Sequence, residues 1–320
     1  MEQFSASDDS PHPSGDDPLW QESALFCWRD AASGIAGFWR LGHEPNVSAL
    51  NSCFGLFSDD GLRFRSNVTG VALSPGDRRD HYFGWGAQLG VQFDGGSTAR
   101  IHADFEECSA SLVFDDFHPR FNYHAVAAPF SSLTGASNHY EVSGRVTGSV
   151  RLGGREFVID ALGYRDRSWG RRDWSTSRGT RWWPCVFGPD LTTHVIHLVT
   201  AERILKVGYV WRDGATIPIV DSDVIVGLES DGFTPRTGTG LFHLQNGETL
   251  KVRCDRADGL LLHVRGYSAC ETLGTSWLEF GDGTIRKGIS NLEVSTNPAG
   301  GKHPPVFAVG ANLGEGLSHR

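Results

Sequence analysis

The chain has 320 residues, 39% of them apolar and 21% charged, a globular balance that is long enough for one large or two ordinary domains. Its net charge of -9 excludes nucleic acid as the expected partner, because a polyanionic surface needs clustered lysine and arginine to displace its counterions. A membrane span is not expected either, since no apolar run reaches the length of a spanning helix.

The start of the chain is acidic and rich in serine and proline, and it lacks the basic and apolar stretches of a signal peptide. We expect residues 1–18 to form a disordered tail. The cysteines are scattered without CxxC or any other zinc-ligand spacing, and we interpret them as buried, reduced thiols of a cytoplasmic protein. They are Cys27, Cys53, Cys108, Cys185, Cys254 and Cys270.

Turn signals recur after the tail, and long amphipathic helical windows are hard to find. The 40 glycines and 10 tryptophans favour many short strands joined by tight turns. The clearest pattern covers residues 140–161, where apolar and polar residues alternate on each side of Gly153-Gly154, and it predicts a hairpin with a two-residue turn. Further hairpin turns are predicted at residues 59–61, 213–214, 231–232 and 258–259.

The expected architecture is a pair of β-barrels. Antiparallel strands without helical crossovers form sandwiches or closed barrels, and closure removes exposed edges while creating an interior that can hold a ligand. Because one such barrel uses about 150 residues or fewer, two fit the chain. We place them at residues 19–173 and 174–320, with the seam between Gly163 and Pro189.

Three motifs carry a resemblance to a known family. Residues 159–174 read IDALGYRDRSWGRRDW, residues 38–46 read FWRLGHEPN, and residues 139–141 read HYE. Over most of residues 20–295 the chain resembles the bacterial, uncharacterised-domain branch of the hydroxyneurosporene synthase (carotenoid 1,2-hydratase) and AttH-like superfamily. The resemblance implies an all-β fold of two tandem lipocalin-like antiparallel β-barrels. Characterised relatives include carotenoid and kievitone hydratases and, more distantly, fungal cyclases of the Diels-Alder type.

The resemblance also implies site residues. Hydratases of that superfamily depend on a Tyr-x-Asp in the central motif and on a histidine shortly upstream, which match Tyr164, Asp166 and His139 here. The chain departs from its branch at Arg167, where the relatives usually have histidine. This departure counts against a proton relay through position 167.

Strand geometry separates the residues of the central motif. Alternate side chains of a strand share a face, so Tyr164 and Asp166 should point into one cavity. Arg165, Arg167 and Trp169 should then point to the opposite side.

These residue types suit acid-base chemistry on an apolar molecule. A carboxylic acid, Asp166, could protonate an electron-rich alkene, with Tyr164 as its hydrogen-bond partner or second acid. His139 and Glu141 are two residues apart, so they can share a strand face, and either could serve as the base. Aromatic faces stabilise a cation, and the residues predicted to bind the substrate are Trp169, Trp182, Trp183, Arg165, Arg167 and Arg172.

Asp166 has an alternative, structural role. Nearby arginines would lower its pKa and could hold it in a cluster of ion pairs that pins the two barrels together. These arginines are Arg165, Arg167, Arg171 and Arg172.

No metal or cofactor is predicted. His194 and His197 are three apart on an expected strand and should face opposite sides, and the dinucleotide, phosphate-loop and GxSxG motifs are absent. We therefore expect a cofactor-independent lyase or isomerase, of the hydratase, dehydratase or cyclase type, acting on a hydrophobic terpenoid or polyketide-like molecule. The alternative is a non-catalytic carrier of lipids or hydrophobic metabolites. A homodimer is left open.

Overall fold

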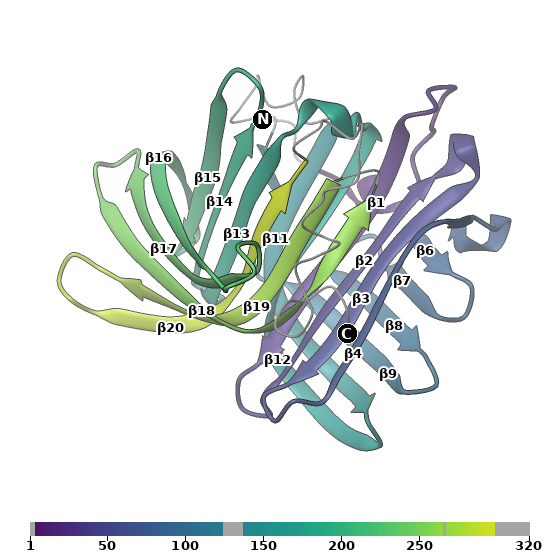
Figure 1. The fold of residues 1–320 in the computed structure, drawn as a ribbon, viewed down its shortest axis with the longest axis horizontal. Coiled ribbons are helices and arrows are strands. Elements are labelled where there is room, and N and C mark those ends of the chain that lie inside the picture. Colours follow the sequence, from purple (N-terminus) through teal and green to yellow (C-terminus); the bar gives the residue numbers. More distant parts are fainter. Residues whose placement is uncertain (1–3, 124–136, 265–266, 298–320) are drawn as a thin grey trace. The chain divides into compact units, whose positions relative to one another are not determined.

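The computed structural model describes residues 4–123, 137–264 and 267–297, and it confirms the predicted all-β class (Figure 1). Antiparallel strands and short 3-10 helices make up the regular structure of these residues. The chain divides into two compact units, residues 1–173 and 174–320. Within the described residues, no helix is long and apolar enough to cross a membrane.

The first unit is built on one curled antiparallel sheet in the order β4-β3-β2-β1-β12-β11-β9-β8-β7-β6-β5, with β10 paired to β11 (Figure 1). Its strands are β1 (Trp20–Asp30), β2 (Ile35–Glu44), β3 (Ala49–Ser58), β4 (Arg63–Ala72), β5 (Arg78–Arg79), β6 (Tyr82–Trp85), β7 (Leu89–Phe93), β8 (Thr98–Asp104), β9 (Cys108–Asp116), β10 (Phe121–Asn122), β11 (Asn138–Leu152) and β12 (Arg155–Arg171). Its 3-10 helices are η1 (Ala6–Asp9), η2 (Pro45–Val47) and η3 (Pro75–Asp77).

This sheet is lipocalin-like but is not the closed barrel that we expected. The end strands β4 and β5 are not paired with each other. β5 has only two residues, and β4 is largely exposed, so a continuous ladder between them has too few hydrogen bonds and too little burial to form. The first unit is therefore a curled, open half-barrel.

The core of the first unit lies on one face of the sheet and includes Phe26, Trp28, Trp39 and Phe114. Strands β8 and β9 alternate buried and more exposed residues, as expected for one covered face. In contrast, β1 and β2 are buried at every position. Both faces of these two strands are therefore shielded from solvent, including the face opposite the core.

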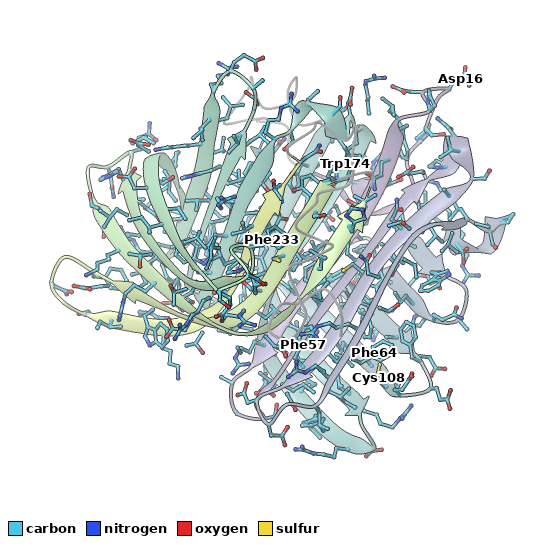
Figure 2. All side chains as sticks on the ribbon, viewed as in Figure 1. Asp16, Phe57, Phe64, Cys108, Trp174 and Phe233 are labelled. Atoms are coloured by element: carbon cyan, nitrogen blue, oxygen red, sulfur yellow. The ribbon has the colours of Figure 1, made fainter. Side chains whose placement is uncertain are left out.

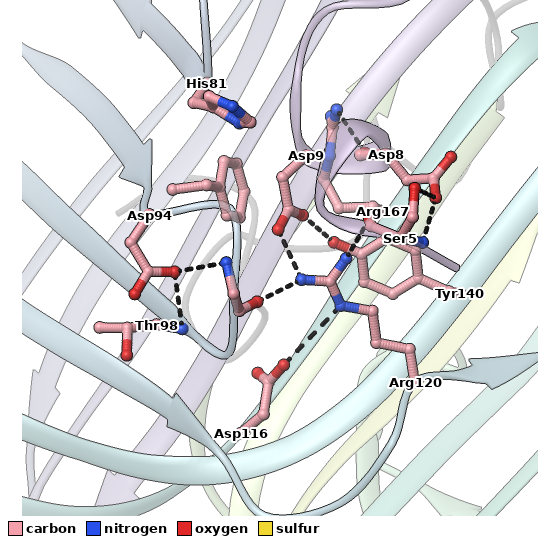
Figure 3. A network of polar contacts seen from close by, with 12 residues as sticks. Ser5, Asp8, Asp9, His81, Asp94, Thr98, Asp116, Arg120, Tyr140 and Arg167 are labelled. Carbon is pink, nitrogen blue, oxygen red and sulfur yellow. Dashed lines mark hydrogen bonds and ion pairs between the residues drawn. The ribbon is translucent and has the colours of Figure 1, made fainter. Parts of the chain in front are cut away.

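The amino-terminal segment is not the disordered tail that its composition predicts. From residue 4 onward it is described, and the Asp9 carboxylate is fully buried. Figure 3 shows Asp9 paired with Arg120 and accepting a hydrogen bond from the Tyr140 hydroxyl. His12 stacks on Trp169, with 4.0 Å between the ring centroids. Asp9 also lies 3.7 Å from Arg165 of β12, so these contacts attach the segment to the sheet.

The second unit is a closed barrel of eight strands in the order β13 to β20 (Figure 1). It contains η4 (Trp174–Thr176), β13 (Gly179–Gly188), β14 (Leu191–Val199), β15 (Ile204–Arg212), β16 (Ala215–Leu228), β17 (Pro235–Leu244), β18 (Thr249–Val264), β19 (Tyr267–Glu279) and β20 (Ile285–Thr296). Trp183 and Phe242 lie in its core, with an edge-to-face ring contact. Closure leaves this unit without unpaired strand edges.

All six cysteines are buried thiols that form no disulfide, and Figure 2 labels Cys108 as one example. Burial raises the pKa of Cys108 and of Cys254 to about 12, so these thiols stay protonated and unreactive near neutral pH. We expect thiol titration of the denatured, unreduced protein to count close to the six free cysteines of the structure. A count near zero would contradict the reducing compartment that the sequence predicts.

Candidate functional site

The strand register brings the predicted catalytic residues to one face of the first sheet. Glu141 of β11 lies opposite Asp166 of β12, and His139 lies opposite Ser168. Directly opposed residues of an antiparallel pair point to the same side, and Tyr164, two residues before Asp166, joins them there. The face carrying Tyr164 and Asp166 is the one opposite the apolar core.

Glu141 is the centre of this group and is fully buried. Its Oε2 accepts a hydrogen bond from the Tyr164 hydroxyl at 2.5 Å and another from the Tyr123 hydroxyl at 3.0 Å. Its Oε1 lies 3.1 Å from Nε2 of His139. The two carboxylate oxygens therefore have different neighbours, two phenols on one side and an imidazole on the other.

Asp166 lies beside this centre, with Oδ2 at 3.9 Å from Nε2 of His139. Burial raises the pKa of Asp166 to about 6, and the charge of Glu141 also raises it, against the lowering effects of His139, Arg172 and Arg40. A carboxyl with a pKa of about 6 holds a proton in about one molecule in ten at pH 7, whereas at its ordinary pKa the fraction is on the order of one in a thousand, and the protonated fraction can serve as a general acid.

Within the described residues Asp166 forms no ion pair with an arginine, so the structure gives no support to its alternative role as an ion-pair anchor. Its ion-pair neighbour among the described residues is His139, and no arginine of that part of the chain lies within ion-pair distance. Arg165 and Arg167 point to the other face, as alternation predicts. The groups that lower the pKa of Asp166 are His139, Arg172 and Arg40 instead of these two arginines.

Three residues predicted to bind the substrate lie away from this site, on the core face. Arg165 makes a bidentate pair with Asp116, with both N–O distances at 2.7 Å. Arg167 pairs with Glu22 at 2.7 Å. Trp169 is covered by the stacked ring of His12. Protein groups already satisfy these side chains, so the structure does not support their predicted role.

The other predicted binding residues are divided between the two units. In the first, Arg172 donates a hydrogen bond to Oγ of Ser168 at 2.6 Å and acts electrostatically on Asp166, which places it near the site. In the second, Trp183 lies in the barrel core, and Trp182 contacts the ring of His194 edge-on. Both tryptophans lie on β13 of the closed barrel.

The sequence did not reveal the role of Tyr123, whose hydroxyl donates to Glu141. Tyr123 follows the short strand β10, and no periodic pattern or motif marks it. The register of β10 against β11 brings it near, with Phe121 opposite Glu141. Only the tertiary pairing identifies this residue.

His139, Glu141 and Asp166 also form a group that could hold a metal ion. One ligand atom of each lies within 4.8 Å of the others. The sequence spacing conceals this group because Asp166 comes from the neighbouring strand. Catalytic zinc sites also have three protein ligands. Oε2 of Glu141 already accepts hydrogen bonds from two phenol hydroxyls, so Oε1 is the oxygen that could bind a metal ion.

Comparisons with known proteins extend over most of the chain. Solved structures with this fold include CghA (12% identity, 88% of this chain and 89% of that chain, TM-score 0.62), an AttH protein from Nitrosomonas europaea (11%, 89% and 94%, 0.66), and kievitone hydratase from Nectria haematococca (10%, 92% and 92%, 0.62). At these identities they show a shared AttH-like fold. No curated protein matches the chain. Residues 5–298 match the domain of unknown function DUF7064, and the chain therefore belongs to the DUF7064 family.

Proposed function

We propose that this protein is a cofactor-independent lyase or isomerase that acts by acid-base chemistry on a hydrophobic, terpenoid or polyketide-like small molecule. The observation that carries the proposal is the pairing of a carboxyl of raised pKa, Asp166, with a histidine and a second carboxylate. A carboxylic acid and an imidazole on one face can act as acid and base in the same reaction.

In the proposed reaction, Asp166 donates its proton to one carbon of an alkene, and the other carbon becomes cationic. Water attacks this carbon and loses a proton to Nε2 of His139, which lies 3.1 Å from Oε1 of Glu141, and the product is an alcohol. Loss of a proton from a neighbouring carbon to the same nitrogen instead gives an isomer. The proton on His139 then returns to Asp166 across the 3.9 Å gap between them, which restores the starting state.

Tyr123 and Tyr164 hold Glu141 in place. Two phenol donors on Oε2 fix the orientation of the carboxylate, and Oε1 lies 3.1 Å from Nε2 of His139. In this proposal Glu141 remains charged and stabilises the protonated histidine. The named activity of kievitone hydratase, which has the same fold, supports the hydratase form of the proposal by analogy.

Isotope labelling tests the reaction class. The wild-type protein is incubated with a panel of terpenoid and polyketide-like alkenes in ¹⁸O-labelled water and, separately, in D₂O, and the products are analysed by mass spectrometry. Hydration introduces both ¹⁸O and deuterium, whereas isomerisation or proton-initiated cyclisation introduces deuterium alone. Compounds that bind but are recovered unlabelled and unchanged would favour the alternative, a carrier.

The acid-base proposal requires that the site work without a metal. We expect protein purified without added metal to contain no stoichiometric zinc or iron, and EDTA to leave its melting temperature and activity unchanged. Equimolar metal in the protein, lost together with activity on chelation and on substitution of His139, would contradict this expectation. It would assign the group to metal binding instead.

A further inference from the structure

Arg40 is a buried cation for which the described residues provide no hydrogen-bond partner. The side chain lies on β2 with 4% of its surface exposed, and neither Nη1 nor Nη2 has a partner in the described part of the chain. Burying an unpaired charge is costly, and the other buried arginines of this unit show the usual solution, since Arg165 and Arg167 are paired with carboxylates. Arg40 therefore has binding capacity that the fold does not use.

Gln21 is next to Arg40 and has the same property. It is 3% exposed, and neither its amide nitrogen nor its amide oxygen has a hydrogen-bond partner among residues 4–123, 137–264 and 267–297. Gly42 lets the two side chains converge. A Cβ added at Gly42 would lie 2.5 Å from Nε2 of Gln21 and 3.2 and 3.3 Å from Nη1 and Nη2 of Arg40. Glycine at this position leaves the space that the two polar groups share.

The register places this pair on the same face as the acid. Arg40 of β2 lies opposite Leu25 of β1, and Leu25 lies opposite Asp166 of β12. Arg40, Leu25, Asp166 and Glu141 therefore form one row across four strands, on one side of the sheet. Because neighbouring strands are about 4.8 Å apart, the backbones of Arg40 and Asp166 are about 10 Å apart. One small molecule can reach both.

We propose that Arg40 and Gln21 bind an anionic oxygen of the substrate, a carboxylate or an enolate, while Asp166 faces its apolar part. The proposal rests on the proposed function and narrows the substrate class. A guanidinium presents parallel donors that match a carboxylate, and the Gln21 amide adds a further donor beside them. A pure hydrocarbon would leave these groups buried and unpaired, so the substrate is an amphiphilic acid.

Binding of a matched pair of probes tests this site. 2-Naphthoate carries the anionic oxygen, and methyl 2-naphthoate is its neutral counterpart, with affinities read from quenching of tryptophan fluorescence. We expect the wild-type protein to bind the acid about tenfold more tightly than the ester, and Arg40→Met to bind both alike, since each tenfold corresponds to about 1.4 kcal/mol. Methionine keeps the apolar stem of the side chain and removes only the charge.

Stability without ligand gives an independent readout. We expect Arg40→Met to raise the melting temperature by about 2 to 4 °C, because it removes an unpaired buried charge. Arg29→Met is the matched control, since Arg29 is also buried but makes two hydrogen bonds to Asp59, at 2.9 and 2.8 Å. It should not raise the melting temperature, and it should keep the preference for the acid.

The outcomes separate this inference from the proposed reaction. A melting temperature of Arg40→Met that is unchanged or lower, or a wild-type protein without preference for the acid, would overturn the inference. Asp166→Asn should retain the preference for 2-naphthoate. If Asp166→Asn also retained full turnover, the acid-base proposal would fail while the Arg40 site would stand.

Discussion

Asp166→Asn is expected to lower turnover by about two orders of magnitude or more without unfolding the protein. Asparagine has nearly the same size but cannot donate the acidic proton. The measurement uses a compound that the wild-type protein converts in the labelling experiment. Tyr164→Phe is the companion variant, because it removes only one of the two hydroxyls on Glu141, and we expect it to have a smaller effect.

The same substitution should make the folded protein more stable near neutral pH. Burial raises the folded-state pKa of Asp166 from 3.8 to about 6, so the stability that the protonated form contributes is present below the unfolded value and is lost as the pH rises through about 6. A shift of this size corresponds to about 2 to 3 kcal/mol. Asparagine stays neutral, and Asp166→Asn should therefore gain most over the wild type above about pH 7.

Urea unfolding of both proteins between about pH 4 and 8 measures this difference. The advantage of Asp166→Asn should shrink as the pH falls through 6 toward 4, and infrared difference spectra of the wild-type protein should show the protonated carboxyl appearing as the pH falls through about 6. A difference in the free energy of unfolding that does not change with pH, or normal turnover in a folded Asp166→Asn variant, would show that Asp166 is not the acid. The proposed function would then shift toward the carrier.

Glu22→Gln is expected to cause the largest loss of stability in the first unit, about 3 to 5 kcal/mol. Glu22 is fully buried, and its carboxylate lies 2.7 Å from both Arg167 and Arg78 and 2.8 Å from Nδ1 of His12. Removing the negative charge leaves the buried guanidinium of Arg167 and the partly buried one of Arg78 without their shared counter-charge. Chemical unfolding of the variant and the wild type measures the loss.

Asp160→Asn is the control for this prediction. Asp160 makes an equally close, bidentate pair with Arg145, at 2.7 Å for both contacts, but the two side chains are 64% and 56% exposed. Solvent screens such pairs, and we expect a change below about 1 kcal/mol. If the two substitutions lowered the free energy of unfolding equally, burial would not be the reason for the contribution of the Glu22 ion pairs to stability.

The Glu22 group also predicts acid sensitivity. Burial by itself would raise the pKa of Glu22, but Arg167, the hydrogen bond with His12 and Arg78 outweigh it and lower the pKa from 4.5 to about 2. The resulting stability is present above the unfolded value and is lost as the pH falls through 2. As the pH falls from 4.5 to about 2, the wild-type protein should lose the stability that the ionised Glu22 contributes. Glu22→Gln never has this contribution, so the free energies of unfolding of the two proteins should become more alike as the pH falls.

The strands and most turns were predictable because alternation and turn residues act locally. Gly153-Gly154 joins β11 to β12 as expected, and residues 213–214 join β15 to β16. The turn predicted at residues 258–259 is wrong, since Gly259 lies inside β18 beside a register shift. A Cβ there would lie 2.0 Å from the carbonyl oxygen of Glu271, so this glycine permits close approach of the next strand. A local pattern cannot distinguish these two uses of glycine.

The sequence by itself determined the all-β class and the separation of Tyr164 and Asp166 from Arg165 and Arg167, because side-chain alternation needs no knowledge of the neighbouring strands. The tertiary structure decided which charges are paired. The partners of the two arginines include Asp116 and Glu22, far away in the chain. Further pairs, between Asp9 and Arg165 and between His12 and Glu22, hold a segment whose composition is typical of disorder. The same physical reason explains the raised pKa of Asp166 and the two nitrogens of Arg40 for which the described residues provide no hydrogen-bond partner. Burial and pairing are set by the strands that lie side by side, and the sequence of one strand does not specify its neighbours.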